Sequence, residues 1–182
     1  MNRLAPIAAL GLVAAMPAQA QDWQLLPVTG SDYKAQPTFA LTAGTQDYDD
    51  GDSGGVYGVE LGLACPTLKP PQGRIRQQIS LTRYDEDGLE TTSLEVNPHY
   101  MVDLASNLAV GFGPGLGYVQ ADTSVGDDGV FALQAGTSLH YRTGPLFLGA
   151  EARYQWTQSA DFGGGSHDMD NIRLQGKVGV AF

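Results

Sequence analysis

Few side chains in this sequence are placed to carry out chemistry, and the first candidates lie near its end. His167 is followed by Asp168 and, two residues later, by Asp170. A histidine beside a carboxylate can activate water for hydrolysis. No hydrolase signature accompanies the group, and Ser124 and Ser159 have no histidine close to them in the sequence. We therefore expect a solvated polar loop at this position and no enzymatic activity.

An acidic segment is the second candidate, for a metal ion. Asp47, Asp49, Asp50 and Asp52 place carboxylate oxygens around Gly51, and Ca²⁺ prefers such hard oxygen ligands. The glycine comes one residue too early for the EF-hand pattern, and a solvated acidic loop would have the same composition. We expect at most weak Ca²⁺ or Mg²⁺ association here, and no other cofactor.

The overall charge limits the possible partners. Ten Lys and Arg against twenty Asp and Glu give a net charge of −10. Binding to nucleic acid independently of sequence needs clustered cations that displace counterions from phosphates. The chain is therefore not expected to bind nucleic acid.

The N-terminal residues have the pattern of a secretory signal peptide. Arg3 precedes an apolar stretch over Leu4–Met16, and the segment ends in Ala18-Gln19-Ala20, as signal peptides do. We expect residues 1–20 to be a signal peptide, residues 21–37 an irregular periplasmic lead, and residues 38–182 one folded domain. An amphipathic or buried N-terminal helix is the alternative interpretation of residues 1–20.

From residue 38 onward the chain alternates apolar and polar residues with period two, which predicts β-strands. Each run is close to the length that a tilted membrane-spanning strand needs. Eight runs show the pattern: Thr38–Tyr48, Val56–Cys65, Arg74–Tyr84, Leu89–Val102, Asn107–Ala121, Val130–Arg142, Leu146–Thr157 and Asn171–Phe182.

Alternation alone does not distinguish a soluble sandwich from a membrane barrel, because only the medium on each face differs. The aromatic residues favour a membrane barrel, since on the apolar faces they fall into two bands near the strand ends, where lipid meets water. Phe112 is the one ring expected at mid-strand. One band has Tyr57, Tyr118, Phe131, Tyr154 and Trp156, and the other has Phe39, Tyr100, Tyr141 and Phe182.

The connections between the runs also favour a membrane barrel. Those at one end are longer on average and hold most of the acids, as extracellular loops would, whereas the other end has shorter turns. Pro98 does not fit the strand pattern, because proline lacks the N–H group that donates to a neighbouring strand. A bulge or a late start of pairing would explain it. Cys65 is expected to be a small filler at the lipid boundary.

At this point the chain resembles the small eight-stranded outer-membrane barrels, such as the OmpA transmembrane domain and OmpX-like proteins, over Thr38–Phe182. The most specific element is the alternating C-terminal run that ends in Phe182. The resemblance implies an all-β, eight-stranded, antiparallel up-and-down transmembrane β-barrel in the outer membrane. It implies that the barrel-assembly machinery reads Phe182, and it transfers no catalytic residue. We expect a monomer among outer-membrane lipids and lipopolysaccharide, with Arg83 close enough to pair with a lipopolysaccharide phosphate.

An eight-stranded barrel has room for its own side chains or one small ligand. Opposite charges inside it should pair, because an unpaired buried charge is costly. We therefore predict a structural or surface-interaction role, with a narrow pore or ligand-binding barrel as the first alternative and a periplasmic lipocalin-like binder as the second. The expected interior charge network is Glu60, Arg76, Glu95, Glu151, Arg153, Arg173 and Lys177.

Overall fold

The computed structural model describes residues 23–49, 53–86, 88–123, 126–158, 160–161, 166–167 and 169–182. The predicted signal peptide lies outside these residues, and so do Asp50, Asp52, Ser124, Ser159 and Asp168. No helix in the described ranges is both long and apolar enough to span a membrane.

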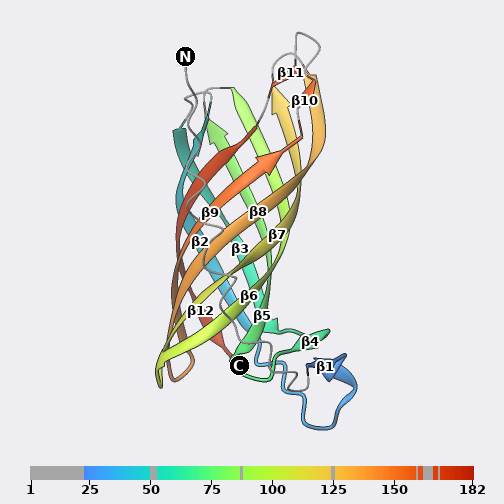
Figure 1. The fold of residues 1–182 in the computed structure, drawn as a ribbon. Helices are drawn as coiled ribbons and strands as arrows, with labels where there is room; N and C mark the ends of the chain where they lie inside the picture. Colours follow the sequence, from blue (N-terminus) through green and yellow to red (C-terminus); the bar gives the residue numbers. More distant parts are fainter. Residues whose placement is uncertain are drawn as a thin grey trace, which may run out of the picture.

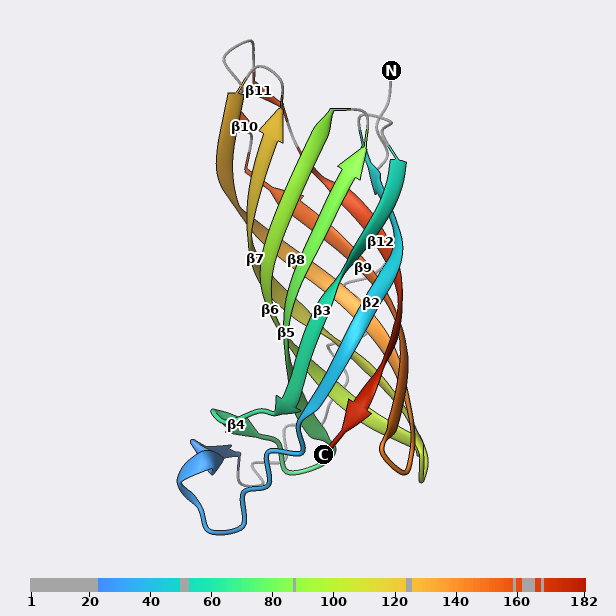
Figure 2. The same ribbon diagram turned by 180° about the vertical axis from the view of Figure 1, so that it is seen from behind.

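The chain folds into a closed, antiparallel β-barrel of eight strands (Figure 1 and Figure 2), which confirms the predicted fold class. Each strand pairs with its neighbours along the chain, and the last barrel strand pairs with the first. In order around the barrel the strands are β2 (Thr38–Tyr48), β3 (Ser53–Ala64), β5 (Arg74–Glu86), β6 (Leu89–Ala105), β7 (Leu108–Thr123), β8 (Gly126–Thr143), β9 (Leu146–Thr157) and β12 (Asn171–Ala181).

The strands run further than the sequence pattern predicts, so most connections are short. We call the end that carries the β2–β3, β5–β6, β7–β8 and β9–β12 connections the loop end, and the opposite end the turn end. Strands β7 and β8 extend toward each other to Thr123 and Gly126. The expected difference in connection length therefore rests mainly on residues 158–170, where β10 (Ala160–Asp161) pairs with β11 (Ser166–His167). At the turn end Gly144, at φ 55°, provides the left-handed conformation that the tight β8–β9 turn requires.

The outer wall of the barrel is apolar. Successive side chains of a strand point to opposite faces, and here the apolar set points outward. Phe112 lies directly opposite Tyr100 on β6, so it belongs to the turn-end aromatic band and not to mid-strand as expected. Well-exposed outward residues on every barrel strand include Leu41, Leu61, Leu81, Leu94, Leu116, Leu133, Leu148 and Leu174.

Pro98 has an explanation that neither a bulge nor a late strand start provides. The β6–β7 register is the same on both sides of it, with the ladder interrupted between Val96 and Tyr100; the register shifts only further along, between Asp103 and Ala105. The unchanged register places Pro98 opposite Pro114 of β7. Two residues without an N–H group therefore share one gap, and the barrel loses few hydrogen bonds.

The segment before the barrel is more regular than predicted. Within residues 23–37, which we call the lead, β1 (Gln24–Leu25) pairs with β4 (Leu68–Lys69) of the β3–β5 connection, and η1 (Pro27–Thr29) follows it. The Tyr33 hydroxyl donates to the Ala64 carbonyl at 2.8 Å. Cys65 is buried beneath this unit with its thiol 3.2 Å from the Thr67 hydroxyl, so it does not fill a gap at the lipid boundary.

Candidate functional site: the barrel interior and the acidic loop end

The interior of the barrel is filled by polar side chains over most of its length. They come from the faces opposite the lipid-facing residues, because each strand alternates. Buried polar residues line every barrel strand except β7, which contributes mainly glycine and alanine.

Lys177 of β12 is the centre of the first ion-pair cluster. Its amino group contacts a carboxylate oxygen of Glu60 and donates to Oε2 of Glu151 at 2.7 Å. The other Glu151 oxygen accepts from Arg153 Nε at 2.9 Å and Nη2 at 2.5 Å. All four side chains are buried, so this cluster joins β3, β9 and β12 across the barrel interior.

A second buried pair lies closer to the loop end. Arg173 Nη2 donates to both oxygens of Glu95 at 2.6 Å, and its Nη1 donates to the Thr82 hydroxyl at 3.1 Å. The Ser80 hydroxyl donates to Glu95 Oε2 at 3.2 Å. The two clusters together contain three cations and three carboxylates, so the middle of the interior is electrically neutral.

Arg76 was predicted to belong to this network, and the structure places it elsewhere. Its guanidinium contacts the Thr38 hydroxyl and donates to the Gln36 carbonyl at 3.4 Å. The reason is the register, because Arg76 lies opposite Ala64 whereas Glu60 lies opposite Ser80, four residues further from the turn end. Arg76 instead lines a cavity of about 430 Å³ at the turn end, together with Arg74 and Arg142.

Neutral polar residues complete the interior network, and the sequence prediction omitted them. Arg153 Nη1 donates to Gln134 Oε1 at 3.2 Å, and Gln134 in turn donates to Gln155 Oε1 at 2.6 Å. His99 Nδ1 lies 2.8 Å from the Ser138 hydroxyl. A His–Ser pair can be a base and its nucleophile, but His99 is fully buried, so the pair has no access for a substrate from outside. The inward alternation of these residues was the available sequence signal.

Glycines of β7 and β8 make room for this network. A Cβ atom added to Gly115 would lie 1.8 Å from Asn97 Oδ1, and one on Gly136 would lie 3.4 Å from the Arg153 guanidinium carbon. At these positions, the space beside the glycines is therefore occupied by side chains from other strands.

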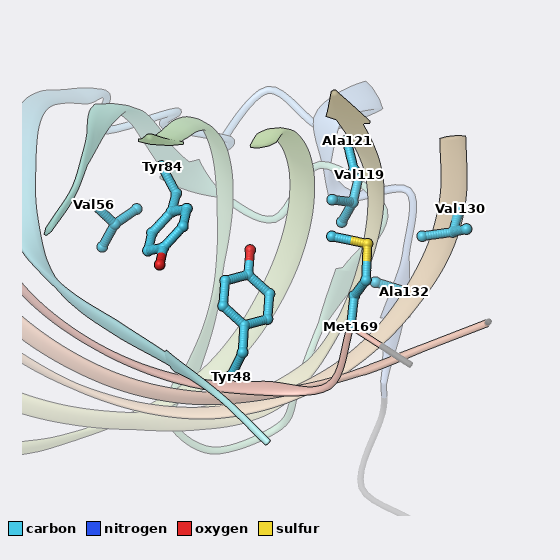
Figure 3. Close-up of a cluster of buried hydrophobic side chains, with 8 residues drawn as sticks. All are labelled: Tyr48, Val56, Tyr84, Val119, Ala121, Val130, Ala132 and Met169. Carbon is cyan, nitrogen blue, oxygen red and sulfur yellow. The ribbon is translucent and has the colours of Figure 1, made fainter. Parts of the chain in front are cut away.

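Toward the loop end, apolar side chains gather inside the barrel (Figure 3). The Tyr48 and Tyr84 rings meet edge to face at 5.2 Å, and the Tyr48 hydroxyl lies 3.2 Å from that of Thr91. This cluster, which we call the apolar plug, lies mainly between the ion pairs and the loop end, and the sequence did not predict it. Its members are Tyr48, Val56, Tyr84, Val119, Ala121, Val130, Ala132 and Met169.

A row of carboxylates crosses the outer face at the loop end. Asp85 lies opposite Glu90, Glu90 opposite Asp122, and Asp122 opposite Asp127. We call these four residues the carboxylate row. Adjacent strands are about 4.8 Å apart, and like charges directly opposite each other are destabilising. One cation lies close by, since Arg83 Nη2 is 2.7 Å from Glu90 Oε2, so Arg83 already has a partner other than a lipid phosphate.

The predicted metal ligands are only partly described. Asp49 Oδ2 accepts from the Tyr154 hydroxyl at 3.1 Å, and Asp47 lies opposite Ile172 of β12. Asp170, predicted beside His167, accepts from the Thr157 amide at 2.7 Å and thus holds the end of β9. Among the described residues no group of three or more His, Cys, Asp or Glu is placed to hold a metal ion.

No protein-family model and no curated protein sequence matches the chain. Solved structures do match it. Neisserial surface protein A has a TM-score of 0.56 at 18% identity, with 80% of this chain and 96% of that chain covered. Ail, the attachment invasion locus protein of Yersinia pestis, has a TM-score of 0.53 at 12% identity, covering 82% and 100%.

The N-terminal β-barrel domain of Pseudomonas aeruginosa OprF also matches, with a TM-score of 0.52 at 16% identity over 82% of this chain and all of that chain. These likenesses show the fold, and they confirm the predicted resemblance to small eight-stranded outer-membrane barrels. A closed barrel with an apolar outer wall is the architecture of outer-membrane proteins, in agreement with the predicted location.

Proposed function

We propose that this small outer-membrane barrel acts at the cell surface, where its acidic loop end holds divalent cations against the phosphates of lipopolysaccharide. The carboxylate row carries this proposal. It lies on the outward face four residues beyond the Tyr118–Phe131 aromatic pair, which is about 13 Å along the strands. That distance extends from the lipid boundary into the headgroup layer.

The chemistry of the row suits Mg²⁺ or Ca²⁺ bound between protein and lipid. Both ions take carboxylate, phosphate and water oxygens together, and a bound cation would relieve the repulsion between the opposed acids. Because the described residues form no chelating group, the ions would be shared with lipid phosphates. This makes Mg²⁺ and Ca²⁺ surface counterions instead of resident cofactors.

The filled interior supports a structural role over a conducting one. Paired charges occupy the middle of the barrel, and the apolar plug covers them toward the loop end. One neighbour, Ail, was crystallised with the heparin analogue sucrose octasulfate. A polyanion of that kind would be repelled by the carboxylate row, so we do not extend this ligand to the present chain.

Calorimetry on the barrel in vesicles tests the proposal. We expect heat of Ca²⁺ binding at millimolar concentration in vesicles containing lipopolysaccharide, and loss of at least half of it in Asp122→Asn/Asp127→Asn. Asp32→Asn is the matched control, because Asp32 is an exposed acid at the turn end. No heat, or equal heat in both variants, would contradict the proposal. Single-channel steps in a planar bilayer would favour a pore instead.

A further inference from the structure

The lead and β4 together form a small unit that carries exposed apolar residues. Trp23, Leu25, Leu26 and Val28 are 55%, 75%, 55% and 47% exposed. Four large apolar side chains within six residues are unusual on a surface that faces only water. The barrel wall exposes such residues because lipid covers them. The apolar residues of the lead must likewise have something that covers them.

The unit has one apolar face and one polar face. Leu25 pairs with Leu68, and Gln24 pairs with Lys69. Because side chains alternate along a strand, Gln24 and Leu25 point to opposite faces of β1. Gln24 and Lys69 line a cavity of about 390 Å³ between the lead and the barrel. Leu68 also lines this cavity, whereas Trp23, Leu25, Leu26 and Val28 do not. We call the side of Gln24 and Lys69, which is turned toward the cavity, the polar face, and the exposed surface of the other four residues the apolar face.

The exposed position of Leu26 requires an unfavourable backbone conformation. Leu26 has φ 50°, in the left-handed region that is unfavourable for a leucine. Its N–H donates to the Thr67 carbonyl at 2.8 Å, and its carbonyl accepts from the Thr29 amide at 3.0 Å. Both backbone groups of Leu26 are thus fixed while its side chain stays more than half exposed.

The position of the unit identifies what covers it. β1 and β4 lie at the turn end and to one side of the barrel, beside its rim and not beneath its opening (Figure 1 and Figure 2). A surface beside the rim of a membrane barrel meets the headgroup layer of the nearer leaflet. Tryptophan prefers that layer, because its ring is apolar and its N–H is polar.

The charge of the unit also fits a phospholipid surface. Residues 23–37 and the β3–β5 connection carry Lys34 and Lys69 against Asp32, with Asp22 just before them, in a chain of net charge −10. Basic residues close to a bilayer are attracted to lipid phosphates. Unlike the carboxylate row, this unit therefore has no excess of acids.

We propose that the apolar face formed by Trp23, Leu25, Leu26 and Val28 is inserted in the interface of the periplasmic leaflet and anchors the turn end of the barrel there. The occupant of this surface is phospholipid. The inference is independent of cation binding at the loop end, because it concerns the opposite end of the barrel.

Tryptophan quenching tests the proposal, since Trp23 and Trp156 are the two tryptophans of the chain. The chain from Gln21 onward, with Trp156→Phe, is refolded into phosphatidylcholine vesicles with and without acyl-brominated phosphatidylcholine, at about one barrel per thousand lipids. We expect bromolipid to reduce Trp23 fluorescence at least twofold, and aqueous iodide to reduce it by less than a tenth.

Two variants make the result specific. Trp23→Phe leaves Trp156, whose side chain is on the lipid-facing wall, and quenching of Trp156 shows that the barrel is inserted. Trp23→Phe/Gln24→Trp/Trp156→Phe places the reporter on the polar face, where we expect at least threefold weaker quenching by bromolipid.

Two outcomes would overturn the proposal. Quenching of Trp23 by iodide and not by bromolipid would show that the face is in water. Protection from both quenchers would show that protein covers it, either a second copy or another segment of the chain.

Discussion

Removing Arg173 from its pair with Glu95 should strongly destabilise the barrel. The two side chains are 3% and 1% exposed, and one guanidinium nitrogen donates to both carboxylate oxygens at 2.6 Å. Arg173→Met would leave Glu95 with the Ser80 hydroxyl at 3.2 Å and the Asn97 amide at 3.5 Å. Breaking one side of a buried ion pair costs about 3–5 kcal/mol, and we expect a loss of that size in the free energy of unfolding.

The double variant Arg173→Met/Glu95→Gln should regain most of that loss, because no charge is then left unpaired. Arg83→Met is the control, since it breaks an ion pair whose side chains are 45% and 35% exposed. Exposed pairs contribute about 1 kcal/mol or less. The difference in free energy of unfolding between Arg173→Met and Arg83→Met therefore reports the effect of burying an ion pair, since both variants break one.

The assay is equilibrium urea unfolding in phospholipid vesicles, followed by tryptophan fluorescence and by the heat-dependent gel shift of the folded barrel. Agreement between the two probes supports a two-state analysis. A loss below about 1 kcal/mol for Arg173→Met would mean that the interior is hydrated enough to solvate Glu95. A double variant as unstable as the single one would show that packing, not charge, causes the loss. Either result would refute the reasoning.

Three further predictions concern other parts of the barrel. Gly44→Ala should lower the free energy of unfolding by about 1–3 kcal/mol, because a Cβ there would lie 1.8 Å from a backbone oxygen; Gly55→Ala, with nothing within 4 Å, should have little effect in the same unfolding assay. Phe182→Ser should reduce the folded fraction in cells but not after refolding in vesicles, as the gel shift would report. Cys65 should react slowly with maleimide, and at least tenfold faster when residues 21–35 are deleted; equal rates would show that the lead does not cover the thiol.

The strands were predictable because lipid imposes a strict pattern on the outer face. Leu94, Leu116 and Leu133 lie in neighbouring strands and point outward, as their alternation predicts. The strand ends were not predictable, since beyond the lipid both faces meet water and alternation is no longer required. Strands β7 and β8 therefore continue through Asp122 and Asp127, which the sequence alone suggests are in a loop.

The sequence predicts which side chains point into the barrel, but not the level of each along the barrel axis. Alternation places Arg76 and Glu60 inside the barrel, and only the pairing register shows that they lie at different levels. The lead could not be predicted for a different reason. β1 has two residues and pairs with Leu68 and Lys69, which lie more than forty positions away, so there is no periodicity to detect.

The charges of this barrel are separated along its axis, and the separation bears on assembly as well as function. The carboxylate row lies at the loop end, and a neutral set of ion pairs fills the middle. At the turn end Arg74, Arg76 and Arg142 line a cavity with one acid, Asp103. For the loop end to reach the outer surface, its carboxylates must cross the hydrocarbon layer, where a charged side chain is costly. The acids that we propose to bind cations thus oppose unaided insertion of the barrel. A chain with such a loop end needs assisted insertion, which lowers the free-energy barrier to moving the carboxylates across the membrane and leaves the acids in place. The C-terminal assembly signal predicted at Phe182 would provide that assistance.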